Sequence, residues 1–297
     1  MEIWVIVTIL AAAVQTLRFT LQKRLKGLGL TTGGATFSRF LFAFPLATIG
    51  AITLLTLRGY DFPALTPAFW GYVVAGGLGQ IIATFCTVAL FSERSFAVGI
   101  AFTKTETIQV AGFSLLFLGE AVSGMGLVAI LIGLAGVLMM SRPPQGWGQA
   151  GFFNRAMGLG LLAGAFFGIS AIGYRGATLA IANDDALFRA TLSLACVTAA
   201  QTIAMSLWLR LREPGEVTKV LTAWRDTLPV GVTGVLGSLG WFTAFALQNA
   251  AYVRSVGQIE LIFSILVSTL FFRERPSGRE IGGMALLAAS IVMIVAL

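Results

Sequence analysis

The chain has 297 residues, of which 57% are hydrophobic and 11% charged, with a formal net charge of +7 and no histidine. Because soluble domains carry about 25% charged residues, this composition indicates an integral membrane protein and argues against a soluble enzyme or binding domain. The basic residues are spread over short loops, as topology and lipid headgroups would require, so nucleic-acid binding is not expected.

Apolar stretches of about 20 residues, the length of a helix that crosses a bilayer, recur along the whole chain. Glycine, proline and charge clusters divide them into ten predicted spans. Their continuous apolar character favours helices over the alternating strands of a barrel. The spans are 3–25, 34–57, 67–91, 95–117 and 122–141, followed by 156–180, 186–209, 227–250, 253–272 and 278–297.

The basic residues also predict an orientation. Thirteen of them follow odd-numbered spans, whereas only Arg58, Arg175 and Arg254 lie in or beside the loops that follow even-numbered spans. The positive-inside rule then places the first set in the cytoplasm and both termini outside. We expect a multi-pass protein of a bacterial inner membrane in this orientation.

The two halves of the chain resemble one another. The segment FLGEAVSGMGL (117–127) aligns with FFRERPSGREI (271–281), and at the same offset Glu106 aligns with Glu260. We therefore predict a five-helix repeat over 1–141, a linker loop over 142–155 and a second repeat over 156–297. A unit with five spans reverses direction in its second copy, and inverted repeats are typical of transporters.

These features resemble the drug/metabolite transporter superfamily, specifically its EamA-type members. The motifs are Arg39 and Arg189 near the starts of spans two and seven, the segment SFAVGIAFTKTE (95–106), and the close of each half: Leu118-Gly119-Glu120 with Gly133 and Gly136, and Phe272-Arg273-Glu274 with Gly282 and Gly283. The resemblance implies an all-α membrane fold of ten helices around a central cavity, and transport of small organic solutes without ATP. Characterised relatives include amino-acid exporters.

Charges inside a span are costly and usually face the bundle interior or a watery cavity. Lys104 and Glu106 lie two residues apart and cannot share one helical face, so we do not expect them to pair with each other. Inversion would bring Glu106 and its repeat partner Glu260 to the centre, where one of them could balance Lys104 or Arg18. Substrate or proton handling and a purely structural neutral pair are both consistent with this pattern.

Arginines and amides in other spans extend the candidate pathway. Gln15, Arg18 and Gln22 follow i, i+3, i+7 spacing, so this stripe should face protein or water, with snorkelling of Arg18 as the alternative. Arg39 and Arg189 lie near helix starts, where we expect them to anchor the chain at the interface.

Stripes of aromatic and polar residues suggest a solute. Aromatic and amide residues share one face of span eight, and spans six and three carry similar stripes. Packing is the alternative explanation; if the stripes line a cavity, amphipathic solutes such as amino acids fit better than sugars or bare ions. Members of these stripes are Trp241, Phe245, Gln248 and Tyr252, then Phe167, Ser170 and Tyr174, and finally Gln80, Thr84 and Thr87.

The sequence predicts a secondary active transporter, an exporter of small amphipathic metabolites such as amino acids, that works by alternating access. Without histidine, a P-loop or metal-ligand spacing, no enzyme activity, cofactor or metal is expected. Expected partners are a small-molecule substrate, protons as a candidate coupling ion, and lipids; the oligomeric state is open. Two alternatives are proton-coupled efflux of organic cations, which Lys104 and Arg18 would oppose, and a membrane scaffold that transports nothing. The candidate pathway residues are Gln15, Arg18, Gln80, Lys104, Glu106, Tyr174, Trp241, Gln248, Tyr252 and Glu260.

Overall fold

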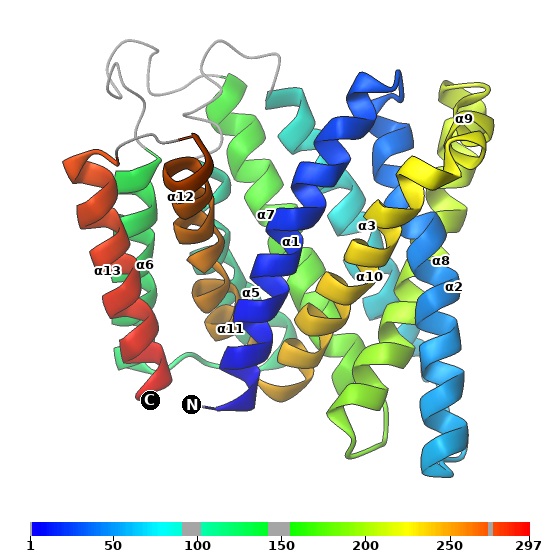
Figure 1. The fold of residues 1–297 in the computed structure, drawn as a ribbon. Helices are drawn as coiled ribbons and strands as arrows, with labels where there is room; N and C mark the ends of the chain where they lie inside the picture. The colour runs from blue at the N-terminus through cyan, green and yellow to red at the C-terminus, as the bar shows by residue number, and fades with distance from the viewer. Residues whose placement is uncertain (1, 91–101, 142–154, 273–275) are drawn as a thin grey trace. The chain divides into compact units, whose positions relative to one another are not determined.

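The computed structural model describes residues 2–90, 102–141, 155–272 and 276–297, which are predominantly helical and contain no strand (Figure 1). Six of the described helices are long and apolar enough to cross a membrane, so the predicted helical membrane fold is confirmed at this level, while the count of ten and the inverted arrangement stay predictions. The helices are α1 (Ile3–Gly27), α2 (Thr32–Arg58), α3 (Pro67–Ala89), α5 (Glu106–Leu118), α6 (Gly124–Met140), α7 (Arg155–Leu179), α8 (Ala186–Arg212), α9 (Glu216–Thr222), α10 (Trp224–Leu247), α11 (Ala250–Gly257), α12 (Ile259–Phe272) and α13 (Gly278–Val295).

Two of the predicted spans are interrupted. The span predicted over 253–272 is divided by a turn at Gln258, between α11 and α12. The span predicted over 95–117 contains a turn at Lys104 and Thr105 before α5 begins, and its residues 95–101 lie outside the described chain. A break that leaves the apolar composition unchanged gives no hydropathy signal, so the sequence did not predict either turn. Residues 142–154 of the predicted linker and Arg273-Glu274 of the second motif also lie outside the described residues.

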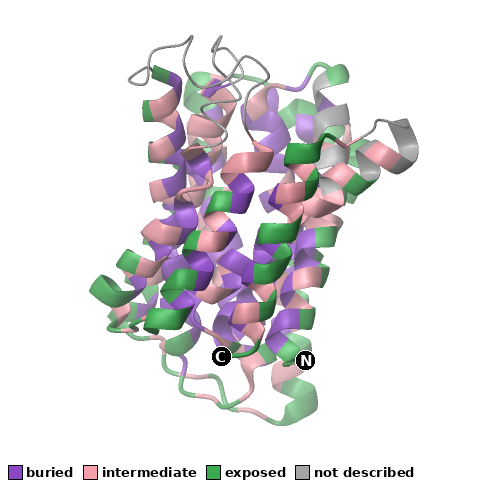
Figure 2. Ribbon diagram, turned by 90° about the vertical axis from the view of Figure 1, so that its left-hand side faces the viewer, coloured by how far each residue is buried: buried purple, intermediate pink, exposed green. Residues whose placement is uncertain are grey.

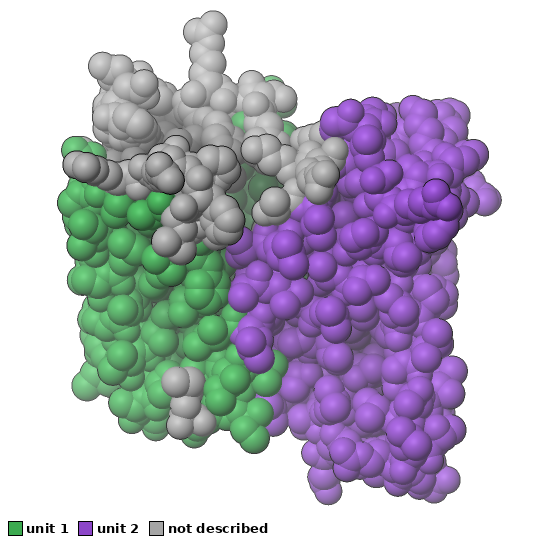
Figure 3. Space-filling model, viewed as in Figure 1, with its two compact units in different colours: residues 1–9, 78–172, 248–297 green, residues 10–77, 173–247 purple. Residues whose placement is uncertain are grey.

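The described residues form two compact units, which are coloured separately in Figure 3. Unit 1 comprises Met1–Ile9, Leu78–Ile172 and Gln248–Leu297, and unit 2 comprises Leu10–Gly77 and Gly173–Leu247. Each unit therefore draws on both halves of the sequence. The repeat over 1–141 and 156–297 remains a prediction about the sequence, and both chain ends lie at the same end of unit 1 (Figure 1).

Burial follows the faces of the helices. Figure 2 shows buried residues on the inner sides of helices and exposed residues on their outer sides. On α2 the exposed side chains include Ile49, Ile52 and Leu57, which are large and apolar. In a membrane protein such faces meet hydrocarbon rather than water, so they need no further partner.

In unit 1, α6 and α13 pack closely through glycines of the family-like motifs. A Cβ added at Gly136 would lie 2.7 Å from the Gly283 carbonyl oxygen, so neither position has room for a side chain. One turn away, Ser290 packs over Gly133, and its hydroxyl donates to the Ala129 carbonyl at 2.7 Å. Small residues allow this close approach where the hydrophobic effect cannot drive helix association.

Replacing Gly136 with Ala should therefore destabilise unit 1. The new methyl group forces α6 away from α13, and overpacking of this kind typically costs about 1–3 kcal/mol. Thermal unfolding in detergent should show a lower midpoint for Gly136→Ala. Gly112→Ala is the matched control, because a Cβ at Gly112 meets no atom within 4 Å and alanine favours the helix. Equal midpoints for Gly136→Ala and the wild type would contradict close packing here.

In unit 2, the short helix α9 is held against the start of α2 by a carboxylate. The Thr31 backbone N–H donates to Glu216 Oε1 at 2.6 Å, and Lys219 Nζ lies 3.2 Å from Glu216 Oε2. Thr31 also caps α2, because its hydroxyl accepts the Gly34 N–H. Burial raises the pKa of Glu216, but the hydrogen bonds from Thr31 and Lys219 outweigh it, so the pKa lies below the ordinary glutamate value.

This shift predicts a pH-dependent contribution to stability. Because the pKa is lower in the folded protein than in the unfolded chain, the carboxylate stabilises the fold above the ordinary glutamate pKa of about 4.3, and the contribution is lost as pH falls through the folded pKa. Glu216→Gln should lower the unfolding midpoint at pH 7, and the difference from wild type should shrink in acid. Asp61→Asn, at an exposed carboxylate, controls for loss of charge. A difference that does not change with pH would contradict the assignment.

Candidate functional site

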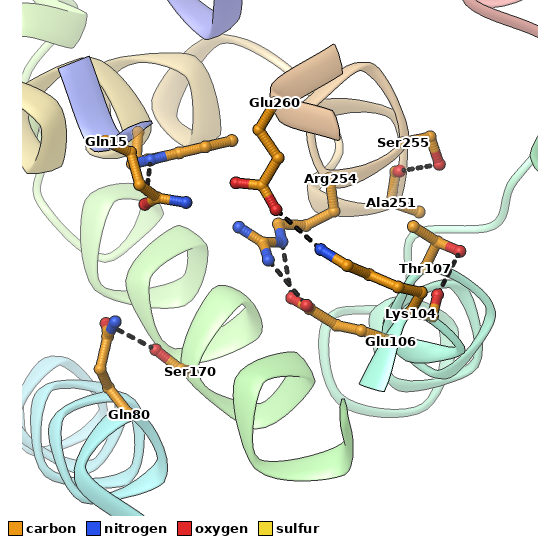
Figure 4. A network of polar contacts seen from close by, with 11 residues as sticks. Gln15, Gln80, Lys104, Glu106, Thr107, Ser170, Ala251, Arg254, Ser255 and Glu260 are labelled. Atoms are coloured by element: carbon orange, nitrogen blue, oxygen red, sulfur yellow. Dashed lines mark hydrogen bonds and ion pairs between the residues drawn. The ribbon is translucent and has the colours of Figure 1, made fainter. Parts of the chain in front are cut away.

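Two ion pairs meet in unit 1 (Figure 4). Lys104 Nζ lies 2.8 Å from Glu260 Oε1. Arg254 contacts the other carboxylate with two nitrogens, Nη2 at 2.7 Å from Glu106 Oε2 and Nε at 2.6 Å from Oε1. The Glu106 side chain is 5% exposed and the other three between 15% and 19%. These four residues, Lys104, Glu106, Arg254 and Glu260, form what we call the crossed ion pairs.

The helix breaks place these side chains. At the first break, the Thr105 hydroxyl donates to the Phe102 carbonyl at 2.7 Å and accepts the Gln109 side-chain amide at 2.9 Å. The turn that results separates Lys104 from Glu106, the first residue of α5. At the second break, Gln258 separates α11, which carries Arg254, from α12. Both breaks therefore occur one or two residues before a glutamate in the first turn of the next helix.

The same arrangement is electrostatically balanced. Glu106 and Glu260 lie in the first turns of α5 and α12, where the helix dipole favours a negative charge. Each carboxylate is paired with a cation from the other segment, because Lys104 reaches α12 and Arg254 reaches α5. The four charges sum to zero in a setting where an unpaired charge would be expensive.

These contacts agree with the prediction that Lys104 and Glu106 do not pair with each other. Glu260 balances Lys104, which was one of the two options left open. Arg254, in contrast, was counted among the residues in or beside loops and was not predicted as a pathway residue. It lies at the edge of the apolar run of span nine, so charge counting treated it as a topology signal. Its position six residues before Glu260 could have indicated a place inside the membrane only if the helix break at Gln258 had been recognised.

Other predicted pathway residues of unit 1 have separate contacts. The Ser170 hydroxyl lies 3.4 Å from Gln80 Oε1, which joins α7 to α3. The Tyr252 hydroxyl accepts the Ser123 backbone N–H at 3.1 Å, at the start of α6. Gln248 follows α10 directly and its side-chain oxygen accepts the Asn249 N–H at 2.8 Å.

In unit 2, the predicted residues gather on α1, α7 and α10. Gln15 Oε1 accepts the Trp241 indole N–H at 3.0 Å, and Arg18 donates to the Gln22 side-chain oxygen at 2.9 Å. Arg18 is 5% exposed, so it faces protein, which agrees with the prediction from its polar stripe. Tyr174 stacks on Phe242 with ring centroids 4.2 Å apart.

Three further arginines of unit 2 are bonded to neutral groups on or beside α10. Arg175 donates to the Phe245 carbonyl at 2.5 Å and Arg189 lies 3.4 Å from the Ala246 carbonyl, both in the last turn of that helix. Such carbonyls have no partner within their helix and carry the negative end of its dipole. Arg175, which was counted among the residues in or beside loops, is buried in α7 near its end. Arg39 donates to the Ser238 hydroxyl at 3.0 Å, so it binds α10 rather than anchoring the chain at the interface.

A double-mutant cycle tests the pairing in unit 1. Glu106→Gln leaves the Arg254 cation without its counter-charge and should lower the free energy of unfolding by about 3–5 kcal/mol, the usual cost of breaking a buried pair. Adding Arg254→Gln removes that cation, so the double variant should be less destabilised than the sum of the two single variants. Denaturant titration in detergent measures both, with the exposed Asp61→Asn as control. Strictly additive losses would contradict the pair.

Comparisons with known proteins agree with this fold. One solved structure, described only as "Crystal structure of protein", has 15% sequence identity and a TM-score of 0.67, and the alignment covers 99% of this chain and 95% of that one. At this identity the likeness shows the fold alone. No curated protein matches the chain.

The family comparison covers the second half of the sequence. Residues 154–296 match the EamA-like transporter family. This stretch includes Arg254 and Glu260 of the crossed ion pairs. It also includes α10 and the two arginines, Arg175 and Arg189, that contact the carbonyls of its last turn. The resemblance drawn from the sequence motifs is confirmed at this level: residues 154–296 match the EamA-like transporter family, which belongs to the drug/metabolite transporter superfamily, and the apolar helices are those of a multi-pass membrane protein.

Proposed function

We propose that this protein is a secondary active transporter that exports small amphipathic metabolites, such as amino acids, across a bacterial inner membrane by alternating access. The observation that carries the proposal is the crossing of two ion pairs at two helix breaks in unit 1. The family match supports transport of a small molecule; the solute class, the direction and the mechanism are our inference.

Helix breaks at membrane depth point to a site rather than to packing alone. Irregular backbone within a bilayer is tolerated only where protein buries it or where it lines a cavity. In transporters, discontinuous helices commonly form the solute site, with half-helix N-termini turned toward charged groups. Here two such N-termini, those of α5 and α12, carry Glu106 and Glu260 in their first turns.

The charges of the cluster suit a solute that carries both signs. A carboxylate could replace a glutamate beside Arg254 or Lys104, and an ammonium group could replace the cation beside Glu106 or Glu260. Such an exchange keeps the net charge at zero and every ion paired, which a low-dielectric site requires. A sugar offers no charge to exchange, and a bare cation would leave Lys104 or Arg254 unpaired. Zwitterionic amino acids therefore fit this cluster best.

The two alternative functions, efflux of organic cations and a scaffold without transport, make different demands on the crossed ion pairs. Proton-coupled efflux of organic cations needs a carboxylate that binds the cation, but both glutamates already contact a basic residue. A scaffold without transport also predicts neutralised charges, so the pairing does not distinguish it from a transporter. The EamA-like domain favours transport.

Transport into proteoliposomes tests the proposal. We expect the purified protein to exchange radiolabelled L-phenylalanine, L-methionine or L-threonine in counterflow, with uridine and tetraphenylphosphonium as comparison solutes. Glu106→Gln and Lys104→Met should each reduce exchange at least tenfold, because each leaves one charge of the cluster unpaired. Arg58→Met is the matched control, since Arg58 is exposed at the end of α2.

Two results would overturn parts of this proposal. Unchanged exchange in both variants would remove the crossed ion pairs from the mechanism. Exchange of uridine or tetraphenylphosphonium without exchange of any amino acid would replace the solute class.

A further inference from the structure

The interior of unit 2 brings two arginines to one glycine of α10. A Cβ added at Gly234 would lie 2.9 Å from Arg39 Cγ and 3.7 Å from Arg18 Cδ, so both side chains pass this point. One turn further along α10, the Ser238 hydroxyl accepts a hydrogen bond from Arg39. Two cations from α1 and α2 thus run along the same stretch of α10.

Arg39 points into the protein rather than into lipid. It lies four residues from Ala35 and four from Ala43 on α2, and both alanines are 2% exposed. Residues four apart share one face of a helix, so Arg39 belongs to the packed face. The contacts with Gly234 and Ser238 place its side chain against α10.

The partners of Arg39 within the described chain are neutral. Its guanidinium has five N–H groups, of which one donates to Ser238, and it lies 5.4 Å from the Phe40 ring centroid. No ion pair of Arg39 occurs among residues 2–90, 102–141, 155–272 and 276–297.

Carboxylates of unit 2 all lie at helix ends or in loops, away from the middle of α10. The six are Asp61, Asp184, Asp185, Glu213, Glu216 and Asp226. Arginine does not lose its proton in proteins, so Arg39 cannot escape the cost of burial by becoming neutral. Arg39 is half-buried, and a cation withdrawn from water in this way needs a counter-charge or a set of oriented dipoles in place of that water.

Ser238 supplies a second feature of an anion site. Its oxygen accepts from Arg39, but no described group accepts its own hydroxyl hydrogen. Ser238 is 7% exposed, so this donor is nearly buried. A buried hydroxyl with its hydrogen still available, beside a guanidinium with further N–H groups, presents several donors and no acceptor to a ligand.

We propose that Arg39, Arg18 and Ser238 form an anion subsite in unit 2 that binds the carboxylate of an organic solute. Trp241 lies three residues beyond Ser238 on the same face of α10, where it would give the subsite an aromatic wall. An aromatic carboxylate combines both chemistries. The proposal deepens the proposed function, on which it rests only for the claim that the bound solute is transported.

Binding can be tested without transport. In an uncharged detergent at constant ionic strength, benzoate should raise the unfolding midpoint of the wild-type protein in a saturable manner, because a ligand that binds only the folded state stabilises it. Benzyl alcohol and benzylammonium have the same ring without the negative charge and should not. Arg39→Gln should abolish the benzoate effect, and Ser238→Ala should weaken the apparent affinity severalfold. Arg58→Gln, which removes an exposed cation of the same helix, should match the wild type.

Several outcomes would overturn the subsite. These are the absence of any benzoate effect, an equal effect of benzyl alcohol, and an unchanged effect in Arg39→Gln. If Arg39→Gln does not fold, Ser238→Ala decides, because unchanged affinity in that variant also contradicts the site. The subsite and the proposed function can fail separately. Amino-acid exchange without benzoate binding overturns the subsite alone, whereas benzoate binding without exchange of any solute overturns the transporter proposal alone.

Discussion

The cost of holding charge inside a membrane protein shapes both units. A buried ion is stable only where another charge or a set of oriented dipoles replaces the water that it has lost. Unit 1 meets this requirement with opposite charges, because Lys104 and Arg254 each reach a glutamate of another segment. If any one of these residues is replaced by a neutral one, its partner becomes an unpaired buried charge, which destabilises the fold.

Unit 2 meets the requirement with dipoles. Arg175 and Arg189 contact the carbonyls of the last turn of α10, which are the acceptors that a helix cannot satisfy itself. The arrangement stabilises both partners, since the cations gain acceptors and the helix end gains donors. Arg39 is the exception, because it meets α10 in mid-helix, where backbone carbonyls are already bonded within the helix. This difference between a helix end and a helix middle distinguishes Arg39 and Arg18, which both pass Gly234, from Arg175 and Arg189.

The sequence predicted the features that depend on composition and local spacing. Helix existence followed from apolar length, and the inward position of Arg18 followed from its spacing with Gln15 and Gln22. Features that depend on where the backbone turns were not predictable in this way. Arg254 and Arg175 were counted as topology signals in or beside loops because each lies near one end of a predicted span, where hydropathy cannot separate a buried charge from an interfacial one. The partners of Arg175, Arg254 and Lys104 are set by contacts between residues 70 to 156 positions apart, which no local pattern contains.

The crossed ion pairs also bear on how a solute could drive a conformational change. They connect the segment around the first break, 102–118, to the segment around the second, 250–272. Any motion that separates these segments must either break both ion pairs, at several kilocalories per mole for each buried charge, or provide new partners. A zwitterionic solute supplies one charge of each sign, so it lowers the cost of separation by its different affinity for the paired and the separated arrangements. A neutral solute of the same size would bind the paired and the separated arrangements with similar affinity, so it would not favour the separation. The ion pairs that stabilise the protein without solute therefore also oppose the separation of the two segments. A solute with matching charges would lower the free energy of that separation, so selectivity for charge and the motion proposed for transport would depend on the same residues.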